Sequence, residues 1–297
     1  MGPIGAWPYD LGQWCYDVGM PELPEVETIR RDLEKEVVGL SVVGLDSTWE
    51  RRVLPSLDVV QKDVVNKKIT SITRLAKILS INLEDGLPRE DRLHLLIHLK
   101  LTGQLLLRQK SDKTDPFVHH KLLLSDGREI RFADSRKFGY IKLASDEDVE
   151  TLQSALGKEP LDVSFNVLDA QKLLERRGSP IKTVLLDQTI FAGVGNIYAN
   201  DALFLAGINP KRPSKSLSEP ELQCLLTCLK DVLNESLKAR GASDNTYIDL
   251  YGQKGGYQNH FKVYGRKGLP CLNQCGENVQ YIKLNQRGTF YCARCQS

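Results

Sequence analysis

The sequence lacks several features that would assign it to a specialised class of protein. Its 297 residues contain no run of about 18 apolar residues, the length that a membrane-spanning helix needs. Its formal net charge of +2 is too small to indicate a nucleic-acid partner by itself. No internal repeat or low-complexity tract is present. With 41% apolar and 26% charged residues the composition is that of an ordinary soluble protein, and the length favours two domains.

The first nineteen residues lack the features of a targeting signal. Residues 1–19 contain no Lys or Arg and no continuous apolar segment, so they do not fit a secretory signal. The Arg and Ser residues typical of a transit peptide are missing as well. We therefore expect a cytoplasmic protein.

Acidic residues are scarce near the C-terminus. From Tyr251 to Ser297 the only carboxylate side chain is Glu277, against seven Lys and Arg residues. A basic segment of this kind is typical of phosphate binding, although a solvated basic surface would have the same composition.

The seven cysteines are unevenly distributed, and four of them cluster near the C-terminus. Cys271-x3-Cys275 and Cys292-x2-Cys295 are two closely spaced pairs separated by a hairpin-length segment. Four thiolates in such a pattern can surround Zn²⁺ tetrahedrally, and this spacing in a chain without a secretory signal favours metal over disulfides. The alternative is four cysteines without a metal, either reduced or adventitiously oxidised. Because all four ligands come from protein, we predict one structural zinc ion.

The pattern of apolar residues predicts two regions of different structure. Pro24 and the acidic residues after it are typical of a helix start. Residues 40–144 then have a β pattern, with a hairpin at Asp126-Gly127. After Ser145 the spacing becomes helical over residues 149–156, 167–177 and 219–239, and Pro180 and Pro220 stand at plausible helix starts. Residues 241–256 are polar and rich in Gly, which predicts a long loop.

Residues 20–28, MPELPEVET, closely resemble the N-terminus of the formamidopyrimidine-DNA glycosylase family. In that family, removal of methionine leaves a terminal proline whose amine is the nucleophile. The resemblance therefore assigns this role to Pro21, with Glu22 as the proton shuttle to the sugar ring oxygen and Glu25 as a support for the amine end. A terminal proline amine has a pKa of about 8, whereas an internal proline is an amide and cannot attack. We therefore expect translation to start at Met20, or processing to expose Pro21.

Further motifs resemble the same family and occur in the family's order. Lys77, in RLAKIL at 74–79, matches a lysine near the damaged base. Leu101, in HLKLTG at 98–103, stands where the family has a methionine wedge. In DSRKFG at 134–139, Arg136 corresponds to the residue that contacts the orphaned cytosine and Phe138 to a second wedge. The resemblance also implies DNA contacts for His120.

The C-terminal half has matching motifs too. AGVGNIYA at 192–199 resembles the family's helix–two-turn–helix element, which implies a phosphate contact for Asn196, and Lys182 is a weaker candidate of the same kind. NQRGTF at 285–290 resembles the hairpin turn, and Arg287 would complete the catalytic set by holding phosphates beside the damaged nucleotide. Taken singly, most of these residues would be ordinary helix acids, surface cations or core side chains.

The resemblance implies an α+β fold. A mainly antiparallel β-sandwich with one leading helix would span residues 20–145. A helical helix–two-turn–helix domain would span 146–241, a lesion-recognition loop region 242–262 and a zinc-finger β-hairpin 263–297, while 1–19 would be a non-family leader.

The expected activity is that of a bifunctional DNA glycosylase and AP lyase of base excision repair. It would act on double-stranded DNA containing 8-oxoguanine or formamidopyrimidines, cleave the strand by β,δ-elimination, and work as a monomer at the bacterial nucleoid. One alternative is an endonuclease VIII-like glycosylase for oxidised pyrimidines. Another is a non-catalytic zinc-containing protein that binds damaged DNA, if the leader is retained.

Overall fold

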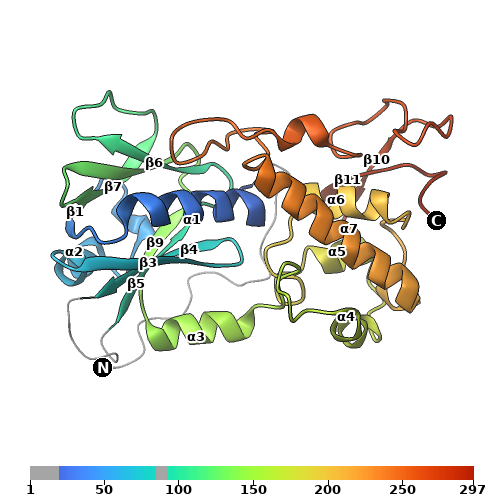
Figure 1. The fold of residues 1–297 in the computed structure, drawn as a ribbon, viewed down its shortest axis with the longest axis horizontal. Coiled ribbons are helices and arrows are strands. Elements are labelled where there is room, and N and C mark those ends of the chain that lie inside the picture. Colours follow the sequence, from blue (N-terminus) through green and yellow to red (C-terminus); the bar gives the residue numbers. More distant parts are fainter. Residues whose placement is uncertain (1–19, 85–91) are drawn as a thin grey trace. The chain divides into compact units, whose positions relative to one another are not determined.

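The computed structural model describes residues 20–84 and 92–297, which form two compact units (Figure 1). The first unit contains Met20–Ala155 and Arg240–Gly255, and the second contains Leu156–Ala239 and Gly256–Ser297. The expected leader, residues 1–19, lies outside the described residues. None of the helices in the described part of the chain combines the length and the apolar character that a membrane crossing needs.

Two β-sheets form the body of the first unit. The four-stranded sheet has the order β1-β7-β8-β6 and is antiparallel throughout. The five-stranded sheet has the order β2-β9-β5-β4-β3, in which only β2 and β9 run parallel. The strands are β1 (Val42–Ser47), β2 (Val53–Leu54), β3 (Lys68–Leu75), β4 (Ile78–Glu84), β5 (Leu93–His98), β6 (Gly103–Gln109), β7 (Val118–Leu124), β8 (Arg128–Asp134) and β9 (Tyr140–Ser145).

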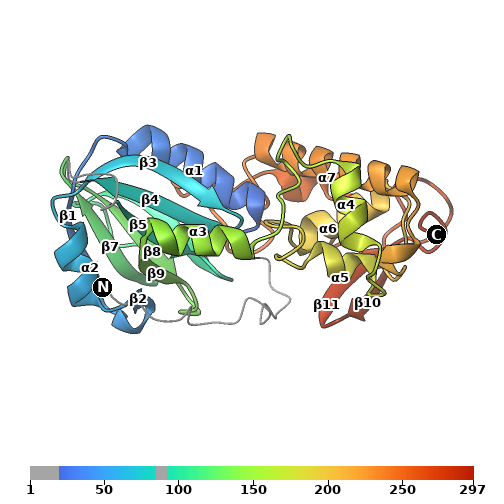
Figure 2. The same cartoon turned by 90° about the horizontal axis from the view of Figure 1, so that it is seen from below.

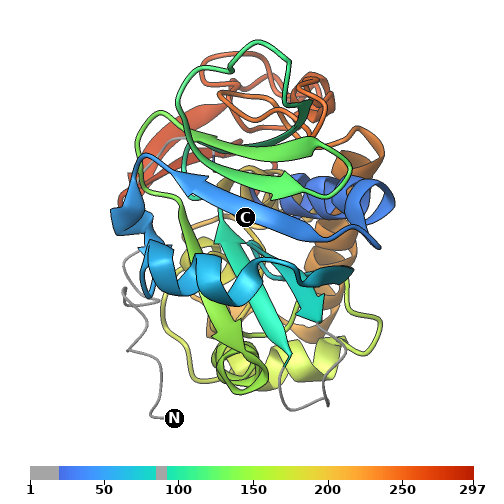
Figure 3. The ribbon, with the colours of Figure 1, turned by 90° about the vertical axis from the view of Figure 1, so that its left-hand side faces the viewer.

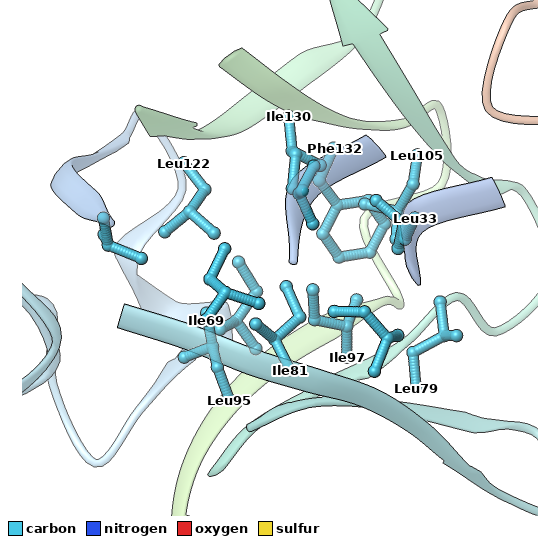
Figure 4. Close-up of a cluster of buried hydrophobic side chains, with 14 of the residues drawn as sticks. Leu33, Ile69, Leu79, Ile81, Leu95, Ile97, Leu105, Leu122, Ile130 and Phe132 are labelled. Carbon is cyan, nitrogen blue, oxygen red and sulfur yellow. The ribbon is translucent and has the colours of Figure 1, made fainter. Parts of the chain in front are cut away.

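The core of the first unit lies between these sheets. Buried side chains from both sheets and from α1 (Leu23–Val37) point toward one another in Figure 4, for example Ile81, Leu105, Ile130 and Leu33. On β4 the inward-facing Leu79, Ile81 and Leu83 alternate with the polar Ser80 and Asn82, which belong to the other face of the sheet. The sandwich is therefore stabilised by burial of one apolar face of each sheet.

Two helices cover other parts of the sandwich. α3 (Asp146–Ala155) lies on the five-stranded sheet (Figure 2). Asp146 attaches the helix to this sheet, because its Oδ1 is 2.8 Å from His94 Nε2. α2 (Leu57–Val64) packs on β1 and β2 (Figure 3). The sequence pattern did not predict α2, although Ser56 caps its N-terminus and Val60 and Val64 share its buried face.

The second unit consists mainly of helices. They are α4 (Val167–Leu174), α5 (Ile181–Leu185), α6 (Asn196–Leu205) and α7 (Glu219–Lys238), with 3-10 turns η3 (Ser214–Ser216) and η4 (Tyr257–His260). A 3-10 turn, η1 (Glu50–Arg52), belongs to the first unit. α6 packs against α5, α7 and the hairpin of β10 (Gln280–Leu284) and β11 (Arg287–Tyr291). α6 is buried over almost its whole length because it is surrounded in this way.

These elements confirm the predicted α+β fold, with an antiparallel sandwich, a helical region and a C-terminal β-hairpin. Pro24 and Pro220 each stand in the first turn of a helix, and Pro180 caps the start of α5. Gly127, with φ +87°, lies in the turn that joins β7 to β8. Residues 241–256 contain no helix or strand, as the composition predicted.

Candidate functional site

The N-terminus of α1 carries two glutamates, Glu22 and Glu25, directly after Pro21. The Glu22 amide donates to Oε2 of Glu25 at 2.8 Å, and the Val26 amide donates to the Glu22 carbonyl at 3.1 Å. Pro21 is buried, and Glu22 and Glu25 are 3% and 1% exposed. The amide groups at a helix start favour carboxylates at this place. The local fold therefore fixes both acids in the first turn of α1, directly after Pro21 in the chain.

Lys77 lies in the two-residue turn between β3 and β4. Its preceding residue, Ala76, has φ +52°, and Lys77 itself is only 4% exposed. It is therefore not a solvent-exposed lysine at a strand edge. Burial, together with the positive charges of Lys100 and Lys77, holds the pKa of His98 well below its usual value.

Lys100 adds a second cation to this region. Burial, followed by the charges of Arg52 and Lys77, lowers the pKa of Lys100 from 10.5 to about 8. Its Nζ stands 5.7 Å from the centre of the Tyr140 ring. Positive charge is thus concentrated at one end of the sandwich, which suits an anionic ligand such as a phosphate.

The two loops with the predicted wedges are joined by Asp134, which is 4% exposed. Its carboxylate accepts hydrogen bonds from the Thr102 hydroxyl, from the Arg136 amide at 3.1 Å and from the Gly139 amide at 2.7 Å. Asp134 is the first residue of the DSRKFG motif, but nothing in the sequence indicates that it contacts Thr102. This contact holds the loops after β5 and β8 in one arrangement.

The predicted wedge residues differ in exposure. Leu101 is buried, with 5% of its surface exposed, whereas Phe138 is 39% exposed. The Arg136 guanidinium lies over the Phe138 ring at 4.9 Å. Phe138 is therefore not an ordinary core residue, and it presents an aromatic face together with a cation.

His120 lies on β7, with its side chain buried in the first unit. Its Nδ1 is 2.9 Å from the Ser47 hydroxyl, and its ring is 5.5 Å from that of Phe132. Burial, and then the neighbouring His119, lower the pKa of His120 to about 4, so it is neutral at physiological pH. Its DNA contact stays a prediction.

In the second unit, Asn196 and Arg287 begin two elements that contact each other. Asn196 is the first residue of α6, and Arg287 is the first residue of β11. Asn285 and Gln286, with φ +46° and +61°, form the two-residue turn before Arg287, as expected of a tight hairpin. The Asn200 side chain accepts the Phe290 amide at 2.8 Å and so connects α6 to β11.

Lys182 connects the hairpin to α5. Its side chain is fully buried, and Nζ donates to the Gly288 carbonyl and to the Thr289 hydroxyl, each at 2.7 Å. In this position Lys182 holds the strand that begins with Arg287. The predicted phosphate contact of Lys182 itself is not tested by these contacts.

Two other buried polar residues, Gln188 and Asp201, were not among the residues predicted for the site. Gln188 donates to the Val194 carbonyl and accepts from the Gly193 amide, both at 2.9 Å, which fixes the glycine-rich turn before α6. Asp201 accepts the backbone amides of Lys262, Val263 and Tyr264 at 2.9–3.1 Å. Asp201 therefore fixes the segment that leads into the cysteine cluster.

The four C-terminal cysteines meet in one cluster. Their sulfur atoms all lie within 4.8 Å of one another, with Cys271 Sγ 3.8 Å from Cys295 Sγ and Cys275 Sγ 3.5 Å from Cys292 Sγ. A tetrahedral zinc site with Zn–S bonds of about 2.3 Å implies S–S separations of about 3.8 Å. The cluster therefore fits Zn²⁺, and the three-residue spacing between Cys271 and Cys275 allows the four thiols to converge. The Gln296 side chain accepts the Cys292 amide at 2.8 Å and supports this geometry.

Three family models match successive parts of the chain. Residues 20–141 match the formamidopyrimidine-DNA glycosylase N-terminal domain, and residues 156–247 match the formamidopyrimidine-DNA glycosylase H2TH domain. Residues 268–297 match the zinc finger found in FPG and IleRS, which together with the sulfur geometry confirms one structural zinc site.

Similar proteins share nearly the whole length. A formamidopyrimidine-DNA glycosylase of Herpetosiphon aurantiacus is 41% identical over 280 residues, which cover 94% of this chain and 100% of that protein. One of Enterococcus faecalis is 36% identical, over 93% of this chain and 97% of that protein. The Lactococcus lactis Fpg in complex with DNA containing an abasic site has a TM-score of 0.85 and 34% identity, covering 93% of this chain and 99% of that one. By sequence and by fold, the chain belongs to the formamidopyrimidine-DNA glycosylase family.

Proposed function

We propose that this protein is a bifunctional base-excision-repair enzyme that removes oxidised purines from double-stranded DNA and then cleaves the strand. The observation that carries the proposal is the arrangement of Pro21, Glu22 and Glu25 at the start of α1. A solved relative with a TM-score of 0.85 and 35% identity, a mutant of the Lactococcus lactis FPG, is in complex with DNA containing Fapy-dG. The same lesion class is therefore the first substrate to test.

In the proposed chemistry the Pro21 amine attacks C1′ of the damaged nucleotide. The N-glycosidic bond breaks, the base leaves with a proton, and the nitrogen and C1′ form an iminium. Glu22 exchanges a proton with the sugar ring oxygen, which opens the ring, and Glu25 orients the amine end. The iminium acidifies C2′, so that successive β- and δ-eliminations release the 3′ and 5′ phosphates.

The cations and wedges would hold the DNA for this reaction. We assign Lys77 and Arg287 to phosphates beside the lesion, and Asn196 to a phosphate at the start of α6, where backbone amides also point outward. Leu101, Arg136 and Phe138 would fill the space left by the extruded nucleotide. We also assign DNA contacts to Lys182, at a phosphate, and to His120, as the resemblance implies.

The chemistry requires a free amine, because an internal proline nitrogen is an amide. We propose that the working form begins at Pro21. The match to the family's N-terminal domain begins at residue 20, which supports this start. We also retain the division into a catalytic domain at 20–145, a helical domain at 146–241, a lesion-recognition loop region at 242–262 and a zinc finger at 263–297.

Borohydride trapping tests the nucleophile directly. The chain starting at Met1 and a chain starting at Pro21 are each mixed with a duplex containing 8-oxoguanine opposite cytosine, and the iminium is reduced. We expect a covalent adduct only from the Pro21 form, with peptide mapping placing the DNA on Pro21. An adduct from the Met1 form that disappears in Lys77→Met would instead assign the nucleophile to Lys77. No adduct from either form would favour the non-catalytic damage-binding protein.

A second comparison separates the two enzymatic alternatives. Single-turnover rates are measured on duplexes that contain either 8-oxoguanine or an oxidised pyrimidine such as thymine glycol. We expect the purine lesion to react at least tenfold faster. The reverse order would favour the endonuclease VIII-like alternative. We further propose that the protein acts as a monomer in the bacterial cytoplasm, at the nucleoid, because its DNA substrate lies there.

A further inference from the structure

The loop Arg240–Gly255 belongs to the first unit and contains no regular structure. Its two ends meet: a Cβ on Gly255 would lie 2.7 Å from the Arg240 carbonyl oxygen and would clash with that of Gly241. Arg240 and Gly241 both have positive φ, +61° and +89°, which is uncommon for an arginine. A closed loop of this kind needs specific contacts to hold one conformation.

The loop reaches the amine end through Glu25. Oε1 of Glu25 accepts the Ala242 amide at 2.7 Å, and Oε2 accepts the Glu22 amide at 2.8 Å. A Cβ on Gly241 would lie 3.0 Å from Glu25 Oε1, so the backbone of the loop packs directly on this carboxylate. One buried side chain therefore joins the loop to the residue that follows Pro21.

Arg240 fastens the same loop to α1 at a second point. Its guanidinium pairs with both oxygens of Asp32 and donates to Asp249 Oδ2 from Nε at 3.0 Å and from Nη2 at 2.7 Å. The side chains of Asp32 and Asp249 are only 4% and 1% exposed. Without Arg240, two buried carboxylates would face each other without a counter-ion, which is strongly unfavourable.

The two attachment points act on one face of the helix. Asp32 follows Glu25 by seven residues on α1, which is two helical turns. On the loop, Arg240 and Ala242 are separated by one residue, so the ion pair constrains the backbone that carries the Ala242 amide. Asp249 also accepts the amides of Tyr251 and Gln253 through Oδ1, at 3.0 and 2.8 Å, and so extends the constraint along the loop.

We propose that Arg240 is a positioning residue for the reaction: by joining Asp32 to Asp249 it holds the Ala242 amide on Glu25 and thereby keeps Glu22 and the Pro21 amine in the reactive arrangement. This inference rests on the proposed amine chemistry of Pro21. Arg240 itself touches neither the amine nor Glu22 in the contacts described. Loss of Arg240 should therefore lower the rate of iminium formation, because displacing a nucleophile by about 1 Å slows its attack strongly.

The test uses Arg240→Met in the form of the protein that traps DNA. The substrate is a duplex with a preformed abasic site, which removes base recognition from the measurement. We expect the single-turnover rate of borohydride-trapped iminium formation to fall about tenfold. The Kd for a duplex with an uncleavable tetrahydrofuran site should stay within twofold, and the Ala242 amide should exchange its hydrogen faster.

Arg128→Met is the matched control. Arg128 also joins α1 to a second carboxylate, since it pairs with Glu36 and Asp126 at 2.7 Å each. Glu36 lies in the last turn of α1, well after Glu25, and meets the loop at the exposed Tyr251, whose hydroxyl donates to it at 3.1 Å. In Arg128→Met the rate of iminium formation should stay within twofold of that of the unmodified protein. An equal loss in both variants would mean that any weakening of α1 slows the reaction, and would overturn a specific role for Arg240.

A double variant, Arg240→Met with Asp32→Asn, separates positioning from loss of stability. It removes one of the two facing charges, so it should recover thermal stability while the rate stays about tenfold low. Recovery of the rate together with stability would overturn the proposal, as would an Arg240→Met rate within twofold of the unmodified protein. Failure of the unmodified protein to trap DNA would instead refute the proposed function.

Discussion

The loop Arg240–Gly255 and the cysteine-rich segment 268–297 are both short, yet the polar groups that hold them differ in chemistry. The cysteine-rich segment surrounds a zinc site of four thiols that lie near one another in sequence. The loop is held by two contacts with α1: Arg240 binds Asp32, 208 residues away in the chain, and the Ala242 amide binds Glu25, 217 residues away. A metal site can therefore be recognised from local spacing, whereas a network of distant ion pairs becomes visible only after folding.

Removal of a zinc ligand should have a larger effect than any change in the loop, both on zinc content and on DNA affinity. In Cys292→Ser we expect loss of stoichiometric zinc, because the binding energy of a structural site, on the order of 10 kcal/mol, depends on its complete set of ligands. DNA affinity should fall at least 100-fold as the hairpin with Arg287 loses its order. Metal analysis measures the zinc content, and fluorescence anisotropy measures the DNA affinity. Cys224→Ser, an exposed cysteine on α7, is the control and should retain zinc. Full zinc content in Cys292→Ser would contradict the assignment.

Lys182→Met should show how far the hairpin depends on contacts other than the metal. The change leaves the Gly288 carbonyl and the Thr289 hydroxyl without the bonds they accept from Nζ. We expect a loss of about 2–3 kcal/mol in the free energy of unfolding, with zinc still bound. Urea denaturation gives the value, and Lys172→Met, an exposed lysine on α4, should change it little. An unchanged stability would show that zinc alone holds the hairpin.

Gly255→Ala should disturb the loop of the first unit in a comparable way. The new methyl group would clash with the Gly241 carbonyl oxygen, so the ends of the loop must separate. We expect a loss of about 2 kcal/mol and a slower trapping reaction. Gly178→Ala meets no atom within 4 Å and serves as the control in denaturation and trapping assays. If Gly255→Ala behaved like the control, the loop would be looser than its packing indicates.

Acid should weaken the first unit through Glu27. Burial raises the pKa of Glu27, but hydrogen bonds from Arg30 and Arg31 and the charge of Arg74 lower it overall from 4.5 to about 2. The stabilisation is therefore present above pH 4.5 and is lost as the pH falls toward 2. We expect Glu27→Gln to cost about 1–2 kcal/mol at pH 6 and about a quarter of that near pH 2.5, by urea denaturation. A cost independent of pH would show that packing, and not charge, is lost.

Local patterns predicted much of this molecule. Proline positions and acidic first turns indicated where α1, α5 and α7 begin, and Asp126-Gly127 indicated the β7–β8 hairpin. α2 was missed because its eight residues lie within a long β pattern and only Ser56 and two spaced valines mark it. A short helix needs packing for its stability, and packing is not contained in a local pattern.

The residue types and their spacing were sufficient for the zinc ligands, the helix starts and the family resemblance, because each depends on neighbours within a few residues. The tertiary structure alone showed that Asp134 joins two loops, that Asn200 connects α6 to β11, and that Arg240 secures its loop on α1. These contacts depend on which buried polar groups meet after the chain has folded. Each buried donor or acceptor needs a partner, and folding brings together partners that lie far apart in the chain.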